Sequence, residues 1–144
     1  MAQYYKTIAG GVNIPFDGNG LLAYTEDITE AKTLLGSDSG KVFSLNAAAG
    51  VAITLPAVQA GLNYRIITGA DFATTDFTIV AATEVIQGII TVNGAPVRAD
   101  DSSVISFVAS AGVKGDYVDI VSDGINWYVS GAGFSAGAIT FTAP

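Results

Sequence analysis

Apolar and polar residues alternate along much of this chain with the two-residue period of a half-buried β-strand. β-branched and aromatic side chains fill these short runs, and turn-forming residues separate them. Many short strands at such spacing are typical of a β-sandwich or a barrel. We predict strands over Lys41–Asn46, Val51–Leu55, Leu62–Gly69, Asp76–Ala82, Ile89–Val92, Ser103–Ser110, Asp116–Ser122 and Ile125–Ser130. The pattern therefore predicts an all-β fold, a β-sandwich similar to a jelly roll.

Two dipeptides mark hairpin turns between these strands. Asn93-Gly94 follows an apolar strand, and Asp123-Gly124 separates the last two strands. Both dipeptides tolerate the positive φ angles of a type I′ turn. In the last hairpin the apolar residues alternate with polar ones, which indicates one wet face. Trp127, the only tryptophan, shares its face with Val129 and is predicted to be buried in the core.

One segment leaves two structures open. Asp27 and Glu30 have the spacing of a capping box, so that Ala31–Leu35 could form a short helix that ends at Gly36. The alternative is a strand over the same residues that turns through the polar segment 36–40 into Lys41–Leu45. We favour this hairpin, because so short a helix is not stable by itself.

The two ends of the chain differ from its middle. Residues 1–24 contain four glycines interleaved with asparagine, aspartate and proline, and residues 132–144 contain no charged side chain. We therefore divide the chain into an N-terminal arm over 1–24, a β-sandwich domain over 25–131 and a C-terminal arm over 132–144. The arms either lie against another surface or fold back on their own domain. If they lie against another surface, the candidate interface residues are Tyr4, Tyr5, Ile14, Phe16, Phe134, Ile139 and Phe141.

Composition narrows the range of functions. The 144 residues include 6 basic and 13 acidic side chains, a net charge of −7, and half of the residues are hydrophobic. Such a chain suits one folded domain and is not intrinsically disordered. Its acidity argues against binding to nucleic acid or to anionic lipid, both of which attract basic surfaces. We find no apolar run long enough to span a membrane and no signal peptide, so we expect no export by a standard signal.

Candidate catalytic and metal sites are few. The chain has no histidine and no cysteine, which removes Ser–His and Cys–His pairs and the imidazole and thiolate metal ligands. Gly133–Gly137 matches the G-x-S-x-G nucleophile elbow, but no histidine is present to activate its serine. Two groups of carboxylates, Asp100-Asp101 and Asp116 with Asp119 and Asp123, could contribute to a Ca²⁺ site, although we interpret them as solvated loop charges. We expect no enzymatic activity, no cofactor and no metal.

Four segments resemble a recurrent pattern in bacteriophage virion proteins: Ser39–Ala47, Val51–Pro56, Ala60–Ile67 and Asp116–Val129. The pattern covers residues 37–131 and is similar to the small β-structured decoration, or cement, proteins on the outside of tailed-phage capsids. It also occurs in head-fibre and tail-fibre modules. The resemblance implies a homotrimer that binds the major capsid protein, and it supplies no catalytic residue.

From this resemblance we expect a non-enzymatic virion structural protein, made in the host cytoplasm and bound to the outer capsid surface, where it stabilises the shell. The alternative is a receptor-binding or fibre β module, although the chain lacks a long repetitive shaft. Such a module could bind glycans, because exposed tyrosines such as Tyr64, Tyr117 and Tyr128 could stack on sugars. Tyrosines in strands are more often cross-strand packing partners.

Overall fold

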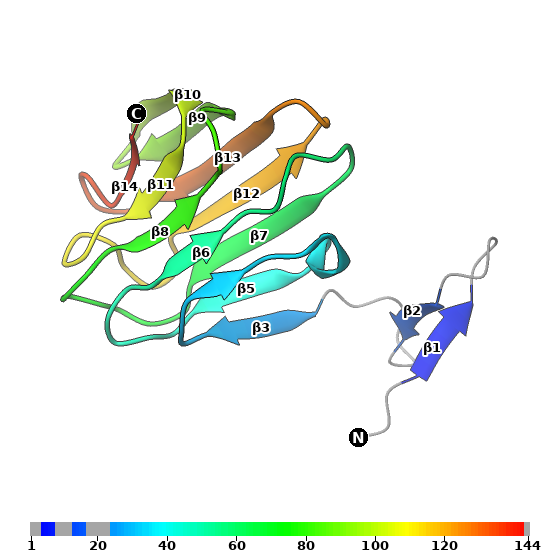
Figure 1. Cartoon of the computed structure of the whole chain (residues 1–144). Coiled ribbons are helices and arrows are strands. Elements are labelled where there is room, and N and C mark those ends of the chain that lie inside the picture. Colours follow the sequence, from blue (N-terminus) through cyan, green and yellow to red (C-terminus); the bar gives the residue numbers. More distant parts are fainter. Residues whose placement is uncertain (1–3, 8–12, 17–23, 143–144) are drawn as a thin grey trace.

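The computed structural model describes residues 24–142, together with the backbone of residues 4–7 and 13–16 (Figure 1). The described residues form fourteen strands and one 3₁₀ turn at Gly36–Asp38. The strands are β1 (Tyr4–Thr7), β2 (Asn13–Phe16), β3 (Thr25–Ile28), β4 (Lys32–Thr33), β5 (Val42–Leu45), β6 (Ala52–Thr54), β7 (Asn63–Thr68), β8 (Phe77–Val80), β9 (Ile86–Val92), β10 (Ala95–Ser102), β11 (Val104–Phe107), β12 (Tyr117–Ser122), β13 (Trp127–Gly133) and β14 (Ile139–Thr142). This content confirms the all-β fold class.

Two sheets pack face to face around one core. A seven-stranded sheet has the order β10-β9-β13-β12-β7-β5-β3, and a five-stranded sheet, nearer the viewer in Figure 1, has the order β14-β11-β8-β6-β4. Both sheets turn alternate residues inward, as the two-residue period requires. The largest buried side chains between them include Phe43, Ile53, Ile66, Phe77, Ile79, Phe107 and Trp127. The burial of Trp127, which is 1% exposed, confirms it as a core residue.

In the first half of the sandwich, successive strands belong to the two sheets in turn. From β3 to β8 the chain passes from one sheet to the other at each strand. Neighbours within each sheet therefore run in the same direction: β3 with β5, β5 with β7, β4 with β6 and β6 with β8 are parallel pairs. The second half adds mainly antiparallel pairs. These parallel pairs distinguish the sandwich from a jelly roll, whose sheets are antiparallel.

The predicted hairpin of residues 31–45 is wrong. Lys32–Thr33 pairs with β6 in the five-stranded sheet, whereas Val42–Leu45 pairs with β3 and β7 in the other sheet. Leu34, which directly follows Lys32–Thr33, is fully buried in the core. The polar segment from Gly36 to Gly40 therefore crosses between the sheets, and each flank finds a parallel partner elsewhere. The alternative helix is not formed either.

The two predicted turns differ. Asn93 and Gly94 have φ angles of 51° and 76°, which confirms a type I′ turn between β9 and β10. The type I′ turn predicted at Asp123-Gly124 is wrong, since the loop between β12 and β13 is four residues long and Asp123 does not have a positive φ. Instead, the Asp123 carboxylate accepts hydrogen bonds from the N–H groups of Ile125 and Asn126, both at 2.8 Å.

Described segments near both ends of the chain form strands as well. Ile139–Thr142 is β14, an edge strand that pairs with β11. Of the two alternatives for the C-terminal segment, folding back on its own domain therefore holds for these residues. At the other end β1 and β2 form an antiparallel pair of their own, in which Tyr4 lies opposite Phe16.

Candidate functional site

The outer face of the seven-stranded sheet carries exposed apolar side chains. Ile89 on β9 is 58% exposed, Val121 on β12 is 51% exposed and Tyr128 on β13 is 44% exposed. Val121 and Tyr128 lie directly opposite each other on neighbouring strands. Scattered single apolar residues need no explanation on a protein surface, but several on one sheet face indicate an interaction surface.

An ion pair lies in the middle of this face. The Arg65 guanidinium donates two hydrogen bonds to the Asp119 carboxylate, at 2.6 and 2.7 Å, across the β7–β12 pair. Hydrogen bonding to Asp119 raises the pKa of Arg65. The guanidinium also lies over the Tyr117 ring, 5.5 Å from its centre. Because the two charges neutralise each other, the centre of the face presents little net charge to a partner.

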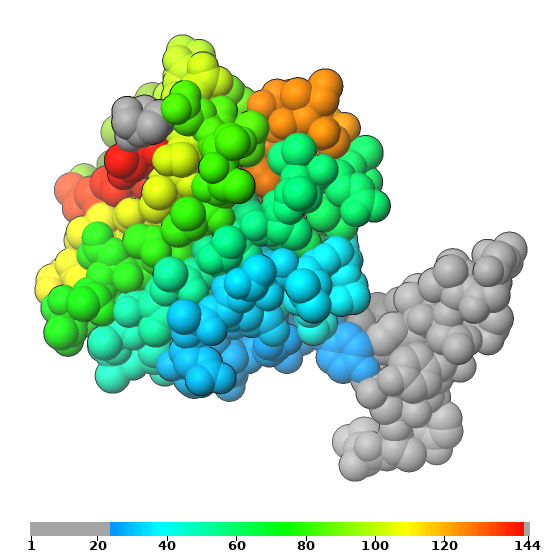
Figure 2. Space-filling model, in the orientation of Figure 1, coloured from blue at the N-terminus to red at the C-terminus, as the bar shows by residue number. Residues whose placement is uncertain are grey.

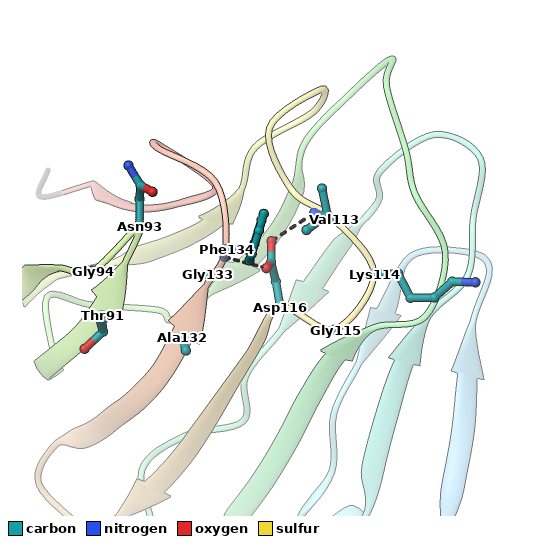
Figure 3. Close-up of a pocket in the computed structure, with 10 residues that line it drawn as sticks. All are labelled: Thr91, Asn93, Gly94, Val113, Lys114, Gly115, Asp116, Ala132, Gly133 and Phe134. Atoms are coloured by element: carbon teal, nitrogen blue, oxygen red, sulfur yellow. Dashed lines mark hydrogen bonds between the residues drawn. The ribbon is translucent and has the colours of Figure 1, made fainter.

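A hollow of about 670 Å³ adjoins the end of this face (Figure 3). Thr91 and Ala132 belong to both surfaces, since they are opposite residues on β9 and β13. The hollow is lined by Thr91, Asn93, Gly94, Val113, Lys114, Gly115, Asp116, Ala132, Gly133 and Phe134. Phe134, which is 80% exposed, has the most exposed large apolar side chain in the described part of the chain. We call Ile89, Val121, Tyr128 and Phe134 the apolar surface.

Asp116 holds the two segments that bound the hollow. Its side chain is buried, and one carboxylate oxygen accepts the N–H of Val113 at 2.9 Å while the other accepts the N–H of Phe134 at 2.8 Å (Figure 3). The carbonyl of Asp116 also accepts the N–H of Thr68. The carboxylate therefore fixes the backbone beneath Phe134, so that an exposed aromatic ring projects from a well-held position.

The carboxylates considered as metal ligands do not come together. Asp116 is buried and hydrogen-bonded, which corrects its interpretation as a solvated loop charge. Asp119 pairs with Arg65, and Asp123 closes the β12–β13 loop. Asp100 pairs with Arg98, and Asp101 accepts a hydrogen bond from Gln87. Within residues 24–142 no group of three or more acidic side chains is arranged to hold a metal ion.

The candidate interface residues have different positions. Phe134 is exposed at the hollow, whereas Ile139 is 1% exposed and has no surface to offer a partner. Phe141 is partly buried against the core. The side chains of Tyr4, Tyr5, Ile14 and Phe16 lie outside the described residues.

Sequence reasoning missed Ile89, Val121 and Tyr128 as candidates. The sequence does contain a signal for these residues. Each of them is next in the chain to an apolar residue whose side chain faces the core, as in Ile89-Ile90 and Ile120-Val121. A strand with one wet face does not require such doubled apolar residues.

The three tyrosines considered as a platform for sugars differ in their exposure. Tyr64 is 2% exposed, and its hydroxyl donates a hydrogen bond to the carbonyl of Leu35 at 2.9 Å. Burial raises the pKa of Tyr64. Tyr117 and Tyr128 remain at the outer face of the seven-stranded sheet, one beneath Arg65 and the other beside Val121.

Comparison of the sequence with models of protein families finds no match, and comparison with curated proteins finds none. In the described part of the chain there is no helix with the length and apolar character needed to cross a membrane.

Proposed function

We propose that this protein is a non-enzymatic structural protein of a phage virion, a decoration protein that binds the outer surface of the major capsid protein shell and stabilises it. The observation that carries the proposal is the apolar surface of Ile89, Val121, Tyr128 and Phe134 on the sandwich. The resemblance of residues 37–131 to phage decoration proteins supports it and supplies the partner. The same resemblance supports a homotrimer as the binding unit.

The apolar surface has the properties of a protein-binding site. Aromatic residues are enriched at the centres of protein interfaces, where charged residues are depleted. Burying a side chain such as Phe134 contributes about 1.5–3 kcal/mol. Because Asp116 already holds the backbone at Phe134, little conformational entropy is lost there on binding. Several copies in one assembly multiply such modest contacts by avidity.

The experiment mixes the purified chain with undecorated capsids of the phage that encodes it and measures the fraction that co-sediments. We expect Phe134→Ser to lower the bound fraction, because it removes the most exposed ring of the surface. The matched control is Leu35→Ser, since Leu35 is 58% exposed but lies between β4 and β5, outside the strands that carry the apolar surface. Both variants should retain the circular dichroism spectrum and thermal midpoint of the wild type.

The possible outcomes distinguish whether the chain binds capsids at all from whether it binds them through the apolar surface. Failure of the wild-type chain to co-sediment at any concentration rejects capsid binding. Equal binding by wild type, Phe134→Ser and Leu35→Ser leaves capsid binding in place but rejects this surface. Because Arg65 and Asp119 neutralise each other, we also expect the bound fraction to change little with ionic strength.

A second candidate function is a receptor-binding or fibre module that binds glycans. The observation in its favour is that Tyr117 and Tyr128 lie on the same sheet face as the hydrogen-bonding groups of Arg65 and Asp119. Aromatic rings beside planar polar groups suit the faces and hydroxyls of a sugar. A glycan array tests it: binding that Tyr128→Ala abolishes supports the fibre module, and absence of binding removes this candidate.

A further inference from the structure

The outer face of the five-stranded sheet has an unusual composition. It faces the viewer in Figures 1 and 2, and no described strand or helix covers it. Its outward residues are threonine, serine, valine and alanine. We call it the uncharged face, and it consists of Thr33, Ala52, Thr54, Thr78, Val80, Val104, Ser106, Thr140 and Thr142.

These residues form two rows across the strands. In one row Val104 lies between Thr142 and Val80. In the other row Ser106 lies between Thr140 and Thr78. The parallel pairs with β6 continue both rows to Thr54 and Ala52, and β4 adds Thr33 to the first. All nine side chains are exposed or half-buried, so they are available to a partner.

The absence of charge on this face contrasts with the rest of the chain. The outer face of the other sheet carries Arg65, Asp119 and Asp27 at strand positions. On the five-stranded sheet, the nearest acidic residues along β8 are Asp76, just before the strand, and Glu84, in the loop after it. Charged residues of both signs are usually interspersed over the surface of a soluble domain, and none of the nine outward positions of this sheet carries one.

We infer that the uncharged face is the surface through which copies of this chain associate with one another. In a symmetric assembly a side chain near the axis meets the same side chain of another copy. A charged residue there would face its own charge, which costs several kcal/mol. A different protein could instead offer complementary charges. A sheet face without charge on a chain with net charge −7 therefore fits another copy of itself.

Hydroxyl side chains strengthen the argument. A threonine or serine hydroxyl both donates and accepts a hydrogen bond, whereas a lysine can only donate and an ionised aspartate can only accept. A hydroxyl can therefore pair with its own copy. Six of the nine residues of the uncharged face carry such a hydroxyl: Thr33, Thr54, Thr78, Ser106, Thr140 and Thr142. The inference rests on the proposed homotrimer only for the number of copies, which would place three five-stranded sheets around one axis.

The test measures molar mass in solution by sedimentation equilibrium of the full chain over a micromolar range. We expect a multiple of the 14.6 kDa chain mass, three for the proposed trimer. Thr78→Lys, in the middle of the uncharged face, should lower the apparent association constant by about tenfold or more, because like charges then meet across the interface. Ser106→Glu provides a second variant of opposite charge. The matched control is Thr91→Lys on the outer face of the seven-stranded sheet, which should retain the wild-type mass.

Circular dichroism and the thermal midpoint establish which variants fold. A folded Thr78→Lys or Ser106→Glu variant with the wild-type mass would overturn the inference, and so would a monomeric wild type over the whole range. Loss of association by Thr91→Lys alone would assign the contact to the other sheet and overturn it as well. Capsid co-sedimentation is a separate measurement, so a monomer that still binds capsids would reject this inference and the homotrimer but retain the proposed capsid binding.

Discussion

Two aromatic residues near the same strand have opposite environments. Trp127 begins β13 and is 1% exposed, in contact with the ring of Tyr64 at 5.8 Å between centres. Phe134 follows the end of β13 and is 80% exposed. The alternation in the last hairpin predicted the first environment. No periodicity surrounds Phe134, and its position depends on Asp116, a contact 18 residues away that the sequence pattern does not reveal.

Replacing Trp127 should therefore destabilise the fold. We expect Trp127→Ala to lower the free energy of unfolding by about 3–5 kcal/mol, because it leaves a large cavity in the core. Tyr128→Ala, one residue away on the exposed face, should cost much less. Urea denaturation of both variants provides the measurement. An unchanged stability of Trp127→Ala would show that the indole does not support the core.

Four charged residues form a network beside the 3₁₀ turn. Lys41 donates to Asp38 at 2.5 Å and to Glu26 at 3.1 Å, and Lys32 also pairs with Glu26. The hydrogen bond from Lys32 is the main cause that lowers the pKa of Glu26. Burial raises the pKa of Asp38, but its hydrogen bonds with Lys41 and the Leu35 N–H outweigh burial, and the net pKa is lowered. The hydrogen bond to Asp38 raises the pKa of Lys41.

These shifts predict how stability depends on pH. The two lowered carboxyl pKa values stabilise the fold above their ordinary values of 4.5 and 3.8, and this stabilisation is lost as the pH falls through the lowered values. The raised pKa of Lys41 stabilises the fold below its ordinary 10.5 and ceases to do so as the pH rises through the raised value. Urea denaturation from pH 2 to pH 7 should show Lys41→Met less stable at pH 7 and less sensitive to acid. Arg98→Met removes an exposed pair and should match the wild type, and equal acid sensitivity of both variants would contradict the network.

At the scale of elements, the sequence pattern predicted the positions of most strands but not their partners in the sheets. All eight strands predicted from the alternation are present, with ends that differ by a few residues. β4 lies within the strand predicted over Ala31–Leu35, although its predicted partner was wrong. β1, β2, β3, β10 and β14 were not predicted, since they are short, polar or rich in small residues. The parallel pairing among β3 to β8 could not be predicted from the sequence. Alternation identifies which residues face inward, but it does not identify which distant strand becomes the neighbour.

The parallel pair of β9 and β13 can be tested at one glycine. Gly88 has a φ of 139°, and a Cβ atom there would lie 2.2 Å from the carbonyl oxygen of Val129 on β13. We expect Gly88→Ala to lower the free energy of unfolding by more than about 2 kcal/mol. Gly94 has a positive φ of 76°, but a Cβ atom there would meet no atom within 4 Å. We therefore expect Gly94→Ala to lower the free energy of unfolding by only about 1–2 kcal/mol. Equal thermal midpoints for the two variants would contradict this strand pairing.

At the scale of the molecule, the sandwich and the N-terminal segment should be separable. Residues 24–142 contain the shared core, and β1 pairs with β2 in a sheet of its own. We expect deletion of residues 1–23 to preserve the far-UV circular dichroism spectrum and the thermal midpoint. Tyr24 is retained because its carbonyl accepts the N–H of Val42. Unfolding of the truncated chain would show that the N-terminal segment belongs to the core.

The same truncation tests the role of that segment in attachment. Ordering backbone costs about 1–2 kcal/mol per residue, so a glycine-rich segment needs a large contact surface to remain fixed. If a neighbouring protein provides this surface, the truncated chain should co-sediment with capsids less than the full chain does. Equal co-sedimentation would assign attachment to the sandwich alone.

The central claim is that this chain binds the outer surface of a phage capsid, and electron cryomicroscopy of capsids reconstituted with the chain tests it most directly. The account predicts density for the two-sheet sandwich on the outer surface of the shell, with Phe134 and the adjoining end of the seven-stranded sheet toward the major capsid protein. It also predicts that neighbouring copies meet through their five-stranded sheets. Capsids that carry no such density at saturating protein, or virions in which this density lies on the tail, would contradict the claim.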